Sequence, residues 1–386
     1  MASRVPMWAL GALLLALVGG GAAAGAAGKC SFPAIFNFGD SNSDTGTTFV
    51  AFNDLSYPYG MSYKENAKRF SDGRVIIDYL AENLGLPYLE SPLDTIGTSY
   101  KYGANFATGG SKISPILPAW AALPIPMYLD VQISEFLQFK SRTIDFYNQL
   151  KNDYNSSESE FILIPFFFFS LSNQEVMAVV SANDDFYNTS IPVVIEQYYS
   201  GLQRLIQSGA KFLWLHNRGP TGCMPVTVGE CRLNKTACLD KVKGYINSEN
   251  ELYDQHGCVR GQNKKTKMFN RLWKQSVDKL RAQYPDVVIT TFDMYTAKSK
   301  IIANAQKFGF LDPFKQCCGN STVFCGIRQP NMGPLLGTAC QDPTKYISWD
   351  GIHYSQAANK LVANLIIEGS LTSPPSTPIS RACHKP

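Results

Sequence analysis

The chain has little charge, and this excludes several classes of function. Of its 386 residues, 17% are charged, whereas typical soluble domains contain about 25%. Lysine plus arginine (35) nearly balance aspartate plus glutamate (31), which leaves a formal net charge of +4. No long run of like charges would suit a nucleic acid. Because 45% of the residues are hydrophobic, we expect a folded protein with a large core that binds no nucleic acid.

The strongly apolar stretch at the start of the chain is too short for a membrane anchor. Trp8 to Val18 falls below the ~20 residues that a spanning helix needs. It follows Arg4 and precedes the small residues Gly19 to Gly28, a pattern typical of a secretory signal peptide. We therefore expect a signal peptide over residues 1–28 and export of the remainder. Four N-x-S/T sequons agree with export and predict glycosylation at Asn155, Asn188, Asn234 and Asn320.

The rest of the chain contains neither a membrane-length apolar run nor a flexible linker. Its longest apolar run, Phe161 to Phe169, includes Pro165 and favours a buried strand. The proline- and glycine-containing stretches are short and rich in aromatic residues or cysteines, unlike spacers. We expect a soluble mature protein with one domain over residues 29–386 and no stable membrane span.

Cysteine is plentiful, and in an exported chain it favours disulfides. The alternative is a metal site, but Cys317, Cys318 and Cys325 do not form the C-x-x-C pairs of structural zinc sites, and no histidine is suitably spaced. We expect no metal and no cofactor, and the pairing of the cysteines stays open at this point. The ten cysteines are Cys30, Cys223, Cys231, Cys238, Cys258, Cys317, Cys318, Cys325, Cys340 and Cys383.

Strand-like and helix-like segments alternate along the chain, which indicates an α/β fold with helices on both faces of a parallel sheet. Short apolar runs predict strands at Ala34–Phe38, Phe161–Phe169, Lys211–His216 and Asp286–Phe292. Helices are predicted at Gly73–Leu84, Gln132–Leu150 and Pro192–Gln207, and within Leu239–Ala282 with a break near Gly257. Ligands of such sheets bind beyond the carboxyl ends of the strands, so the residues directly after each strand are candidates for a site.

The first predicted strand leads directly into a polar loop, Gly39-Asp-Ser-Asn-Ser-Asp-Thr-Gly46. A serine there can face a cleft at the sheet edge, with its hydroxyl and its amide pointing the same way. Two interpretations are open: a nucleophile at Ser41, or a capping loop in which Asp40 or Ser41 binds helix amides. On this octapeptide alone, capping is favoured.

A nucleophilic serine needs a base, usually histidine, and an acid that orients it. Three of the four histidines suit this role poorly: His384 in a cysteine-bearing tail, His256 in a turn, and His216 at the end of an apolar strand, where a core histidine is expected. His353 follows Asp350 by three residues and precedes a helix-like segment, Gln356–Ile367. This spacing can place the carboxylate on one imidazole nitrogen and leave the other for Ser41.

The chain lacks the G-x-S-x-G, H-E-x-x-H and G-x-x-x-x-G-K motifs, and its serine-first order matches no serine-protease arrangement. It resembles instead the plant secreted GDSL esterase/lipases of the SGNH hydrolase superfamily. The resemblance implies a three-layer α/β/α sandwich with a central, mainly parallel sheet of flavodoxin-like type. It also implies Ser41 as nucleophile, His353 as base and Asp350 as orienting acid. The matching blocks are Phe32–Gly46, Arg69–Arg74, Gly103–Ser111, Leu129–Gln132, Gly219–Pro225, Cys317–Gly319 and Trp349–Tyr354.

The family's oxyanion hole uses the amide of the nucleophile, the amide of a glycine and the side chain of an asparagine. Ser41 and Gly110 match the first two, although a plain turn glycine is the alternative for Gly110. The chain departs from the family at the third donor, because it has Ser172-Asn-Gln-Glu175 where the family has Gly-x-Asn-Asp. An ungapped match puts Gln174 at the asparagine, and a shift of one residue puts Asn173 there. Loss of such a donor typically slows catalysis by about 10²- to 10³-fold.

The resemblance therefore predicts a secreted carboxylic ester hydrolase outside the cell or in the cell wall. Its partner is an acyl or acetyl ester of a polysaccharide, a glycoside or a lipid, attacked through a serine acyl-enzyme. Two alternatives remain: an acyltransferase that passes the same acyl group to an alcohol, and a catalytically impaired binding protein. The altered segment at Ser172–Glu175 is the reason for the second alternative.

Overall fold

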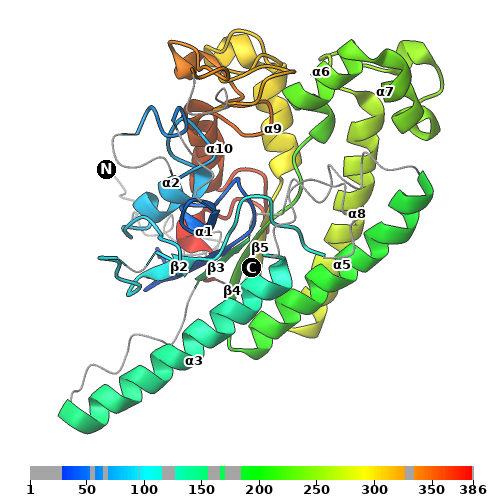
Figure 1. Cartoon of the computed structure of the whole chain (residues 1–386). Helices are drawn as coiled ribbons and strands as arrows, with labels where there is room; N and C mark the ends of the chain where they lie inside the picture. The colour runs from blue at the N-terminus through cyan, green and yellow to red at the C-terminus, as the bar shows by residue number, and fades with distance from the viewer. Residues whose placement is uncertain are drawn as a thin grey trace, which may run out of the picture.

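The α/β class is confirmed by a six-stranded sheet at the centre of the molecule (Figure 1). The computed structural model describes residues 28–52, 57–63, 68–94, 96–114, 127–154, 166–169, 184–326 and 334–384, so nearly all of the predicted signal peptide lies outside them. The strands are β1 (Ile35–Phe38), β2 (Gly103–Asn105), β3 (Phe166–Phe169), β4 (Phe212–His216), β5 (Val288–Phe292) and β6 (Thr372–Ser373). They follow the order β2-β1-β3-β4-β5-β6, and all neighbours are parallel except β5 and β6.

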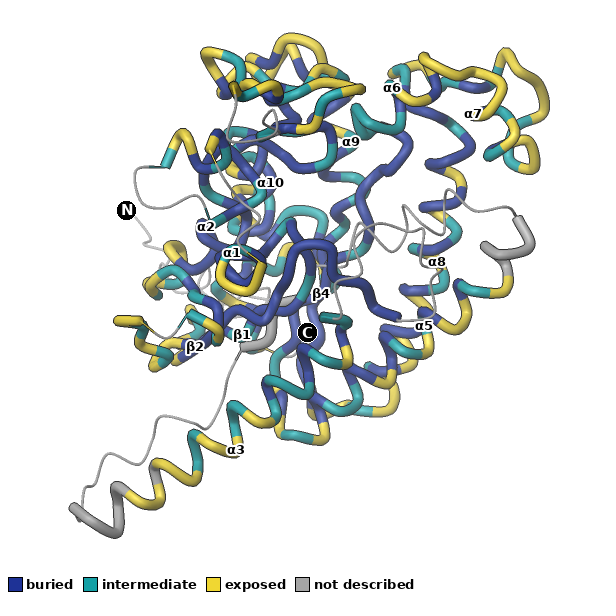
Figure 2. Tube along the Cα trace, viewed as in Figure 1, coloured by how far each residue is buried: buried dark blue, intermediate teal, exposed yellow. Residues whose placement is uncertain are grey.

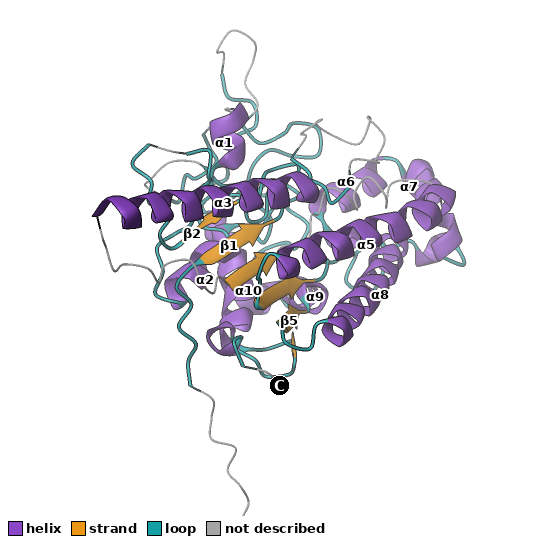
Figure 3. Ribbon diagram, turned by 90° about the horizontal axis from the view of Figure 1, so that it is seen from below, coloured by secondary structure: helices purple, strands orange, loops and turns teal. Residues whose placement is uncertain are grey.

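Two hydrophobic cores lie on the two faces of the sheet, because successive side chains of a strand point to opposite faces. Phe38 and Leu213 enter one core together with α3, α5 and α8, whereas Ile35 and Trp214 enter the other with α2, α9 and α10. Figure 3 shows α3 and α5 running across the strands, and Figure 2 shows β1, β2 and β4 mostly buried. The helices are α1 (Thr47–Phe52), α2 (Ile76–Asn83), α3 (Leu129–Tyr154), α5 (Asp184–Gln207), α6 (Pro225–Leu233), α7 (Lys235–Val242), α8 (Arg260–Gln283), α9 (Met294–Ala303) and α10 (Gln356–Glu368).

The four predicted strands are present as β1, β3, β4 and β5, whereas β2 and β6 were not predicted. β2 is only three residues long and begins at Gly103, which weakens any strand signal. A side chain is excluded at Gly103, since a β-carbon there would lie 1.8 Å from the carbonyl oxygen of Ile35 and φ is +108°. Glycine usually weakens a strand, but at position 103 it is needed because only glycine lets β2 pair closely with β1.

The predicted helix start at Pro192 is wrong, because α5 begins at Asp184 and Pro192 lies inside it. Proline lacks the N–H that would bond to the preceding turn. Ile191, Val194 and Tyr198 are all buried in the core, and this packing offsets the missing hydrogen bond. The predicted break near Gly257 is confirmed, since α7 ends at Val242 and α8 begins at Arg260.

The prediction of disulfides is confirmed, since all ten cysteines are paired. The pairs are Cys30–Cys383, Cys223–Cys258, Cys231–Cys238, Cys317–Cys340 and Cys318–Cys325. Within the described residues, no helix is both long enough and apolar enough to cross a bilayer.

Two of the four predicted glycosylation sites can be located on the surface. Asn234 and Asn320 are exposed. Asn155 lies outside the described residues, as does the side chain of Asn188. Glycosylation itself stays a prediction.

Candidate active site

Ser41 lies in a tight turn directly after β1, and its neighbours hold that turn closed. The carbonyl of Asp40 accepts hydrogen bonds from the amides of Ser43 and Asp44, both at 3.0 Å. The Asp40 carboxylate accepts the Asn42 amide at 2.9 Å. The capping interpretation of Asp40 and Ser41 is therefore wrong. It is Asp44 whose carboxylate accepts the amides at the start of α1, including that of Thr47 at 2.8 Å.

The carboxylate of Asp44 also joins the Ser41 turn to the loop that carries Gly110. It accepts the amide of Gly109 at 2.7 Å, and nearby the amide of Thr108 donates to the carbonyl of Gly39 at 3.2 Å. Gly110 has φ of +76°, a left-handed conformation that favours glycine. Two segments about 70 residues apart are thus connected through buried hydrogen bonds next to Ser41.

Some buried backbone amides in these loops have no acceptor within the described residues. They include the amides of Ser41 and Gly110, both of which are buried. Buried N–H groups are nearly always paired, so two unpaired ones in neighbouring loops are available to an oxygen of a bound ligand. This is the arrangement that stabilises a developing oxyanion. Asn173 and Gln174, the candidates for a third donor, lie outside the described residues.

The structure brings Ser41, His353 and Asp350 into one continuous chain of hydrogen bonds. Ser41 Oγ lies 2.6 Å from His353 Nε2, and His353 Nδ1 lies 2.6 Å from Asp350 Oδ2. Ser41 and His353 are both buried, with 1% and 6% exposure. The carboxylate orients the imidazole, and the imidazole nitrogen facing Ser41 can take its proton.

The Asp350 carboxylate stays ionised despite its burial. Burial by itself raises the pKa of Asp350, but the charge of His353 and the hydrogen bonds from His353 and Ile352 leave it below its usual value. Its Oδ1 accepts the amides of Ile352 and His353 at 3.0 and 2.8 Å. The same side chain therefore closes the turn between residues 350 and 353 and orients the imidazole.

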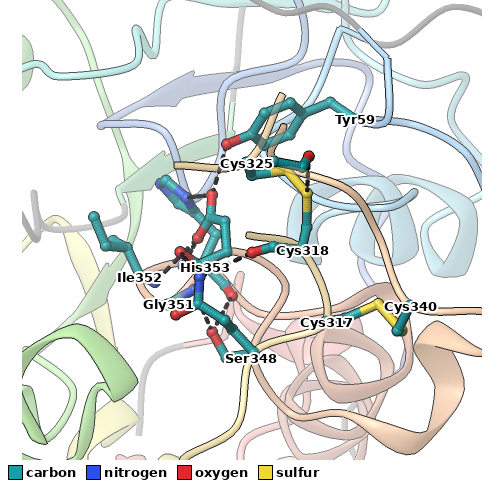
Figure 4. Close-up of a disulfide and its surroundings, with 12 residues drawn as sticks. Tyr59, Cys317, Cys318, Cys325, Cys340, Ser348, Gly351, Ile352 and His353 are labelled. Carbon is teal, nitrogen blue, oxygen red and sulfur yellow. Dashed lines mark hydrogen bonds and ion pairs between the residues drawn. A yellow bond between two sulfur atoms is a disulfide. The ribbon is translucent and has the colours of Figure 1, made fainter. Parts of the chain in front are cut away.

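A disulfide-bonded segment holds this turn from behind. The amides of Cys317 and Cys318 donate to the carbonyls of Ser348 and Trp349, at 3.1 and 2.7 Å. Gln316 Nε2 donates to the carbonyl of Asp350 at 3.1 Å. Figure 4 shows the Cys318–Cys325 and Cys317–Cys340 disulfides beside the turn. The cysteines of this block thus serve a scaffold, not a metal site.

Two polar residues that support the site were not predicted from the sequence. The hydroxyl of Tyr59 donates to Asp350 Oδ2 at 3.0 Å, across 291 residues of chain (Figure 4). The side chain of Gln132 accepts the amide of Gly39 at 3.0 Å and donates to its carbonyl at 2.8 Å. Gln132 belongs to the family-like block Leu129–Gln132, and this membership could have indicated a role near the site. Tyr59 belongs to no such block.

His216 has the structural role that was expected for it. It is buried, and its Nε2 accepts the indole N–H of Trp214 at 2.9 Å. Burial, together with the charge of Lys298, lowers the pKa of His216 to about 3, so the ring is neutral. Among the described residues, one cluster consists of residue types that can bind a metal ion, namely Cys30, Cys383 and His384. Its two cysteines are joined in a disulfide.

Comparison with known proteins gives a consistent match over most of the chain. The model of the GDSL-like lipase/acylhydrolase family matches residues 35–366, a range that contains Ser41, Gly110 and His353. A GDSL esterase/lipase from Arabidopsis thaliana is 38% identical over 92% of this chain and 90% of its own length. A GDSL esterase/lipase from Zea mays is 36% identical over 94% of this chain and 91% of its own length. A protein named alpha-L-fucosidase, also from Arabidopsis thaliana, is 33% identical over 92% of this chain and 93% of its own length.

Proposed function

The chain belongs to the GDSL-like lipase/acylhydrolase family and is a carboxylic ester hydrolase of the esterase/lipase type. From this premise we propose that it cleaves its substrate through an acyl-enzyme on Ser41. The observation that carries the proposal is the unbroken relay from Ser41 Oγ through His353 to Asp350, with both links at 2.6 Å.

In the acylation step, Ser41 Oγ attacks the ester carbonyl carbon while His353 Nε2 takes the hydroxyl proton. The tetrahedral oxyanion accepts the amides of Ser41 and Gly110. His353 then gives its proton to the leaving alcohol oxygen as the ester C–O bond breaks. In deacylation a water attacks the acyl carbon, His353 takes the proton of that water, and the proton returns to Ser41 Oγ as the acid leaves.

The third oxyanion donor is proposed to be either Asn173 or Gln174. Glutamine has the same amide group as asparagine on one more methylene, so it can donate only after an adjustment of the loop. We expect that Asn173→Ala or Gln174→Ala, but not both, lowers kcat about 10²- to 10³-fold. Normal turnover in both variants would show that neither side chain is the donor.

The finer details of fold and location are also proposed. The strand order 2-1-3-4-5 is that of flavodoxin-like sheets, which supports a three-layer α/β/α sandwich of the SGNH type in a single domain. Five disulfides support export after removal of residues 1–28, to the cell exterior or the cell wall.

The fucosidase name of one relative describes a different reaction, and the arrangement around Ser41 supports ester cleavage instead. Glycosidases generally use two carboxyl groups that flank the scissile bond. Among the described carboxylates of this site, Asp350 holds His353, Asp44 holds the start of α1, and Asp40 holds Asn42. We expect no cleavage of a 4-nitrophenyl fucoside under conditions in which 4-nitrophenyl acetate is hydrolysed.

The test of this function uses the exported protein with 4-nitrophenyl esters of increasing acyl length and with acetylated polysaccharides. We expect hydrolysis of at least one ester class, together with covalent labelling by a fluorophosphonate probe. Both should be lost in Ser41→Ala. An unlabelled wild-type protein that hydrolyses no ester would contradict the acyl-enzyme proposal. Predominant transfer to an added alcohol in excess water would favour an acyltransferase.

A further inference from the structure

A pocket beside the turn at residues 350–353 has no part in the mechanism above. It holds about 430 Å³ of empty space, its open mouth included. Its walls come from the segment after β4, from α9 and from the turn itself. Ile352 and Tyr354, the residues on either side of His353 in the chain, both line it. The pocket therefore lies beside the turn that carries His353.

Lys298 of α9 brings a buried positive charge to this pocket. Its side chain lines the pocket and is only 9% exposed. Within the described residues it makes no hydrogen bond and no ion pair, although its Nζ lies 4.3 Å from the centre of the Tyr354 ring. Gly219 makes room for it, since a β-carbon there would lie 2.8 Å from Lys298 Cδ.

Lys298 keeps its positive charge at neutral pH despite its burial. Burial lowers the pKa of Lys298 to about 8, with Asp40 acting in the opposite direction and Arg218 in the same one. The amine is thus still largely protonated at neutral pH.

Tyr354 supplies a hydrogen-bond donor at the same place. Its side chain is 9% exposed, and its hydroxyl has no partner within the described residues. Buried hydroxyl groups are normally hydrogen-bonded, so an orphaned one that lines a pocket points to a missing ligand. Lys298 and Tyr354 together offer a cation and a neutral donor to a small anion.

We propose that this pocket is a subsite for a carboxylate carried by the ester substrate, with Lys298 pairing with the charge and the Tyr354 hydroxyl donating to it. A carboxylate fits these two groups, because the ammonium supplies the opposite charge and the hydroxyl supplies a hydrogen bond. The substrate class is an ester that also bears a carboxylate, such as an acylated acidic sugar or a half-ester of a dicarboxylic acid. This inference rests on the proposed ester hydrolysis.

Matched pairs of acidic and neutral esters test the inference. On the acyl side, mono-4-nitrophenyl succinate is compared with 4-nitrophenyl butyrate. On the alcohol side, 4-acetoxybenzoate is compared with 4-acetoxybenzamide. In at least one pair we expect wild-type kcat/KM to favour the acidic ester. In Lys298→Met the ratio of acidic to neutral kcat/KM should fall about 10- to 100-fold, mainly through KM.

Control variants separate this effect from general damage. Lys300→Met removes an exposed lysine from the same helix and should leave the ratio unchanged. Tyr354→Phe keeps the ring and should lower the ratio several-fold, so it serves as the test if Lys298→Met does not fold. No preference for the acidic ester in either wild-type pair, or equal losses on both esters in Lys298→Met, overturns the subsite.

A binding measurement keeps this test independent of catalysis. With Ser41→Ala protein at constant ionic strength, benzoate or succinate should raise the melting temperature more than the matched amides do. This difference should vanish in Ser41→Ala/Lys298→Met. If carboxylates bind in this way but wild-type protein cleaves no ester, the proposed function fails while the anion site stands. If esters are cleaved and carboxylates have no effect, the subsite alone is overturned.

Discussion

At the scale of single residues, Asp350 combines a structural and a chemical role. One oxygen of its carboxylate holds two backbone amides of its own turn, and the other accepts from His353 and Tyr59. The turn, the imidazole and a distant tyrosine therefore depend on one negative charge. Replacement of that charge should change the stability of the turn as well as the rate of the reaction.

We expect Asp350→Asn to lower kcat by about 10⁴-fold, the loss seen when this role is removed in serine proteases. It should also lower stability at pH 7. The pKa of Asp350 in the folded protein is lower than that of an ordinary aspartate. Its stabilising effect is therefore complete above about pH 4 and is lost as pH falls through the folded-state pKa. Urea unfolding at pH 7 and pH 3 checks this, and a constant stability difference at both values would contradict it.

Tyr59 is expected to act as a positioning residue through Asp350. Tyr59→Phe keeps the ring, which packs against Trp349 and Phe70 with centroids 6.1 and 6.0 Å away. It removes only the hydroxyl that donates to the carboxylate. A hydrogen bond to a charged group contributes about 1.5 to 3 kcal/mol, so we expect kcat to fall about 10- to 100-fold with KM nearly unchanged.

A matched control for Tyr59→Phe is Tyr57→Phe, since Tyr57 is 58% exposed. Steady-state kinetics on a 4-nitrophenyl ester compares the two variants. Equal rates for wild type and both variants would show that the Tyr59 hydroxyl does not help to orient the site.

At the scale of elements, α2 is anchored by a buried ion pair. Arg69 Nε and Nη2 bind the two carboxylate oxygens of Asp78 at 2.8 and 2.6 Å. The same family-like block reaches the 350–353 turn and α10. Ser71 Oγ donates to the carbonyl of Tyr354 at 3.0 Å, and Asp72 accepts the amide of Gln356 at 2.7 Å. The block at residues 69–74 therefore connects two helices to the candidate site.

Removal of one partner of this pair should be strongly destabilising. In Asp78→Ala the Arg69 charge stays buried without its partner, and we expect a loss of about 3 to 5 kcal/mol in the free energy of unfolding. Glu82→Ala is the control. Its partner Arg74 and the 59% exposed Glu82 side chain form a surface pair worth at most about 1 kcal/mol. Urea denaturation measures both, and similar losses in the two variants would contradict this assignment.

At the scale of the whole molecule, contacts between residues far apart in the sequence form the site and join the two ends of the chain. Ser41 and His353 are 312 residues apart in the chain. The Cys30–Cys383 disulfide spans 353 residues, and beside it the amide of Cys30 donates to the carbonyl of Ser380 at 2.7 Å. The two ends of the described chain are thus held against each other.

We expect the double variant Cys30→Ser/Cys383→Ser to lose about 2 to 5 kcal/mol of stability, because the disulfide restricts a very large loop in the unfolded chain. Cys231→Ser/Cys238→Ser opens a bridge between residues only 7 apart. In the chain-entropy account it should lose about 3 kcal/mol less. Thermal or urea unfolding of both variants checks the order, and a larger loss for the short bridge would contradict it.

Local patterns predicted much of the fold and failed where tertiary packing overrides them. Apolar runs predicted β1, β3, β4 and β5, because a buried parallel strand is apolar on both faces. The same rules missed β2, whose Gly103 is needed for contact with Ile35. They also placed the start of α5 at Pro192, although the helix continues through the proline because its other residues pack in the core.

The sequence by itself determined the α/β class, the family, and the loops that carry Ser41, Gly110, Asp350 and His353, because these depend on residues close together in the chain. Only the tertiary structure decided which cysteines pair, that Tyr59 reaches Asp350, and that Lys298 and Tyr354 share a pocket. Most of these contacts join residues tens to hundreds of positions apart. Local spacing cannot specify them, because they form only when the sheet and the helices have packed.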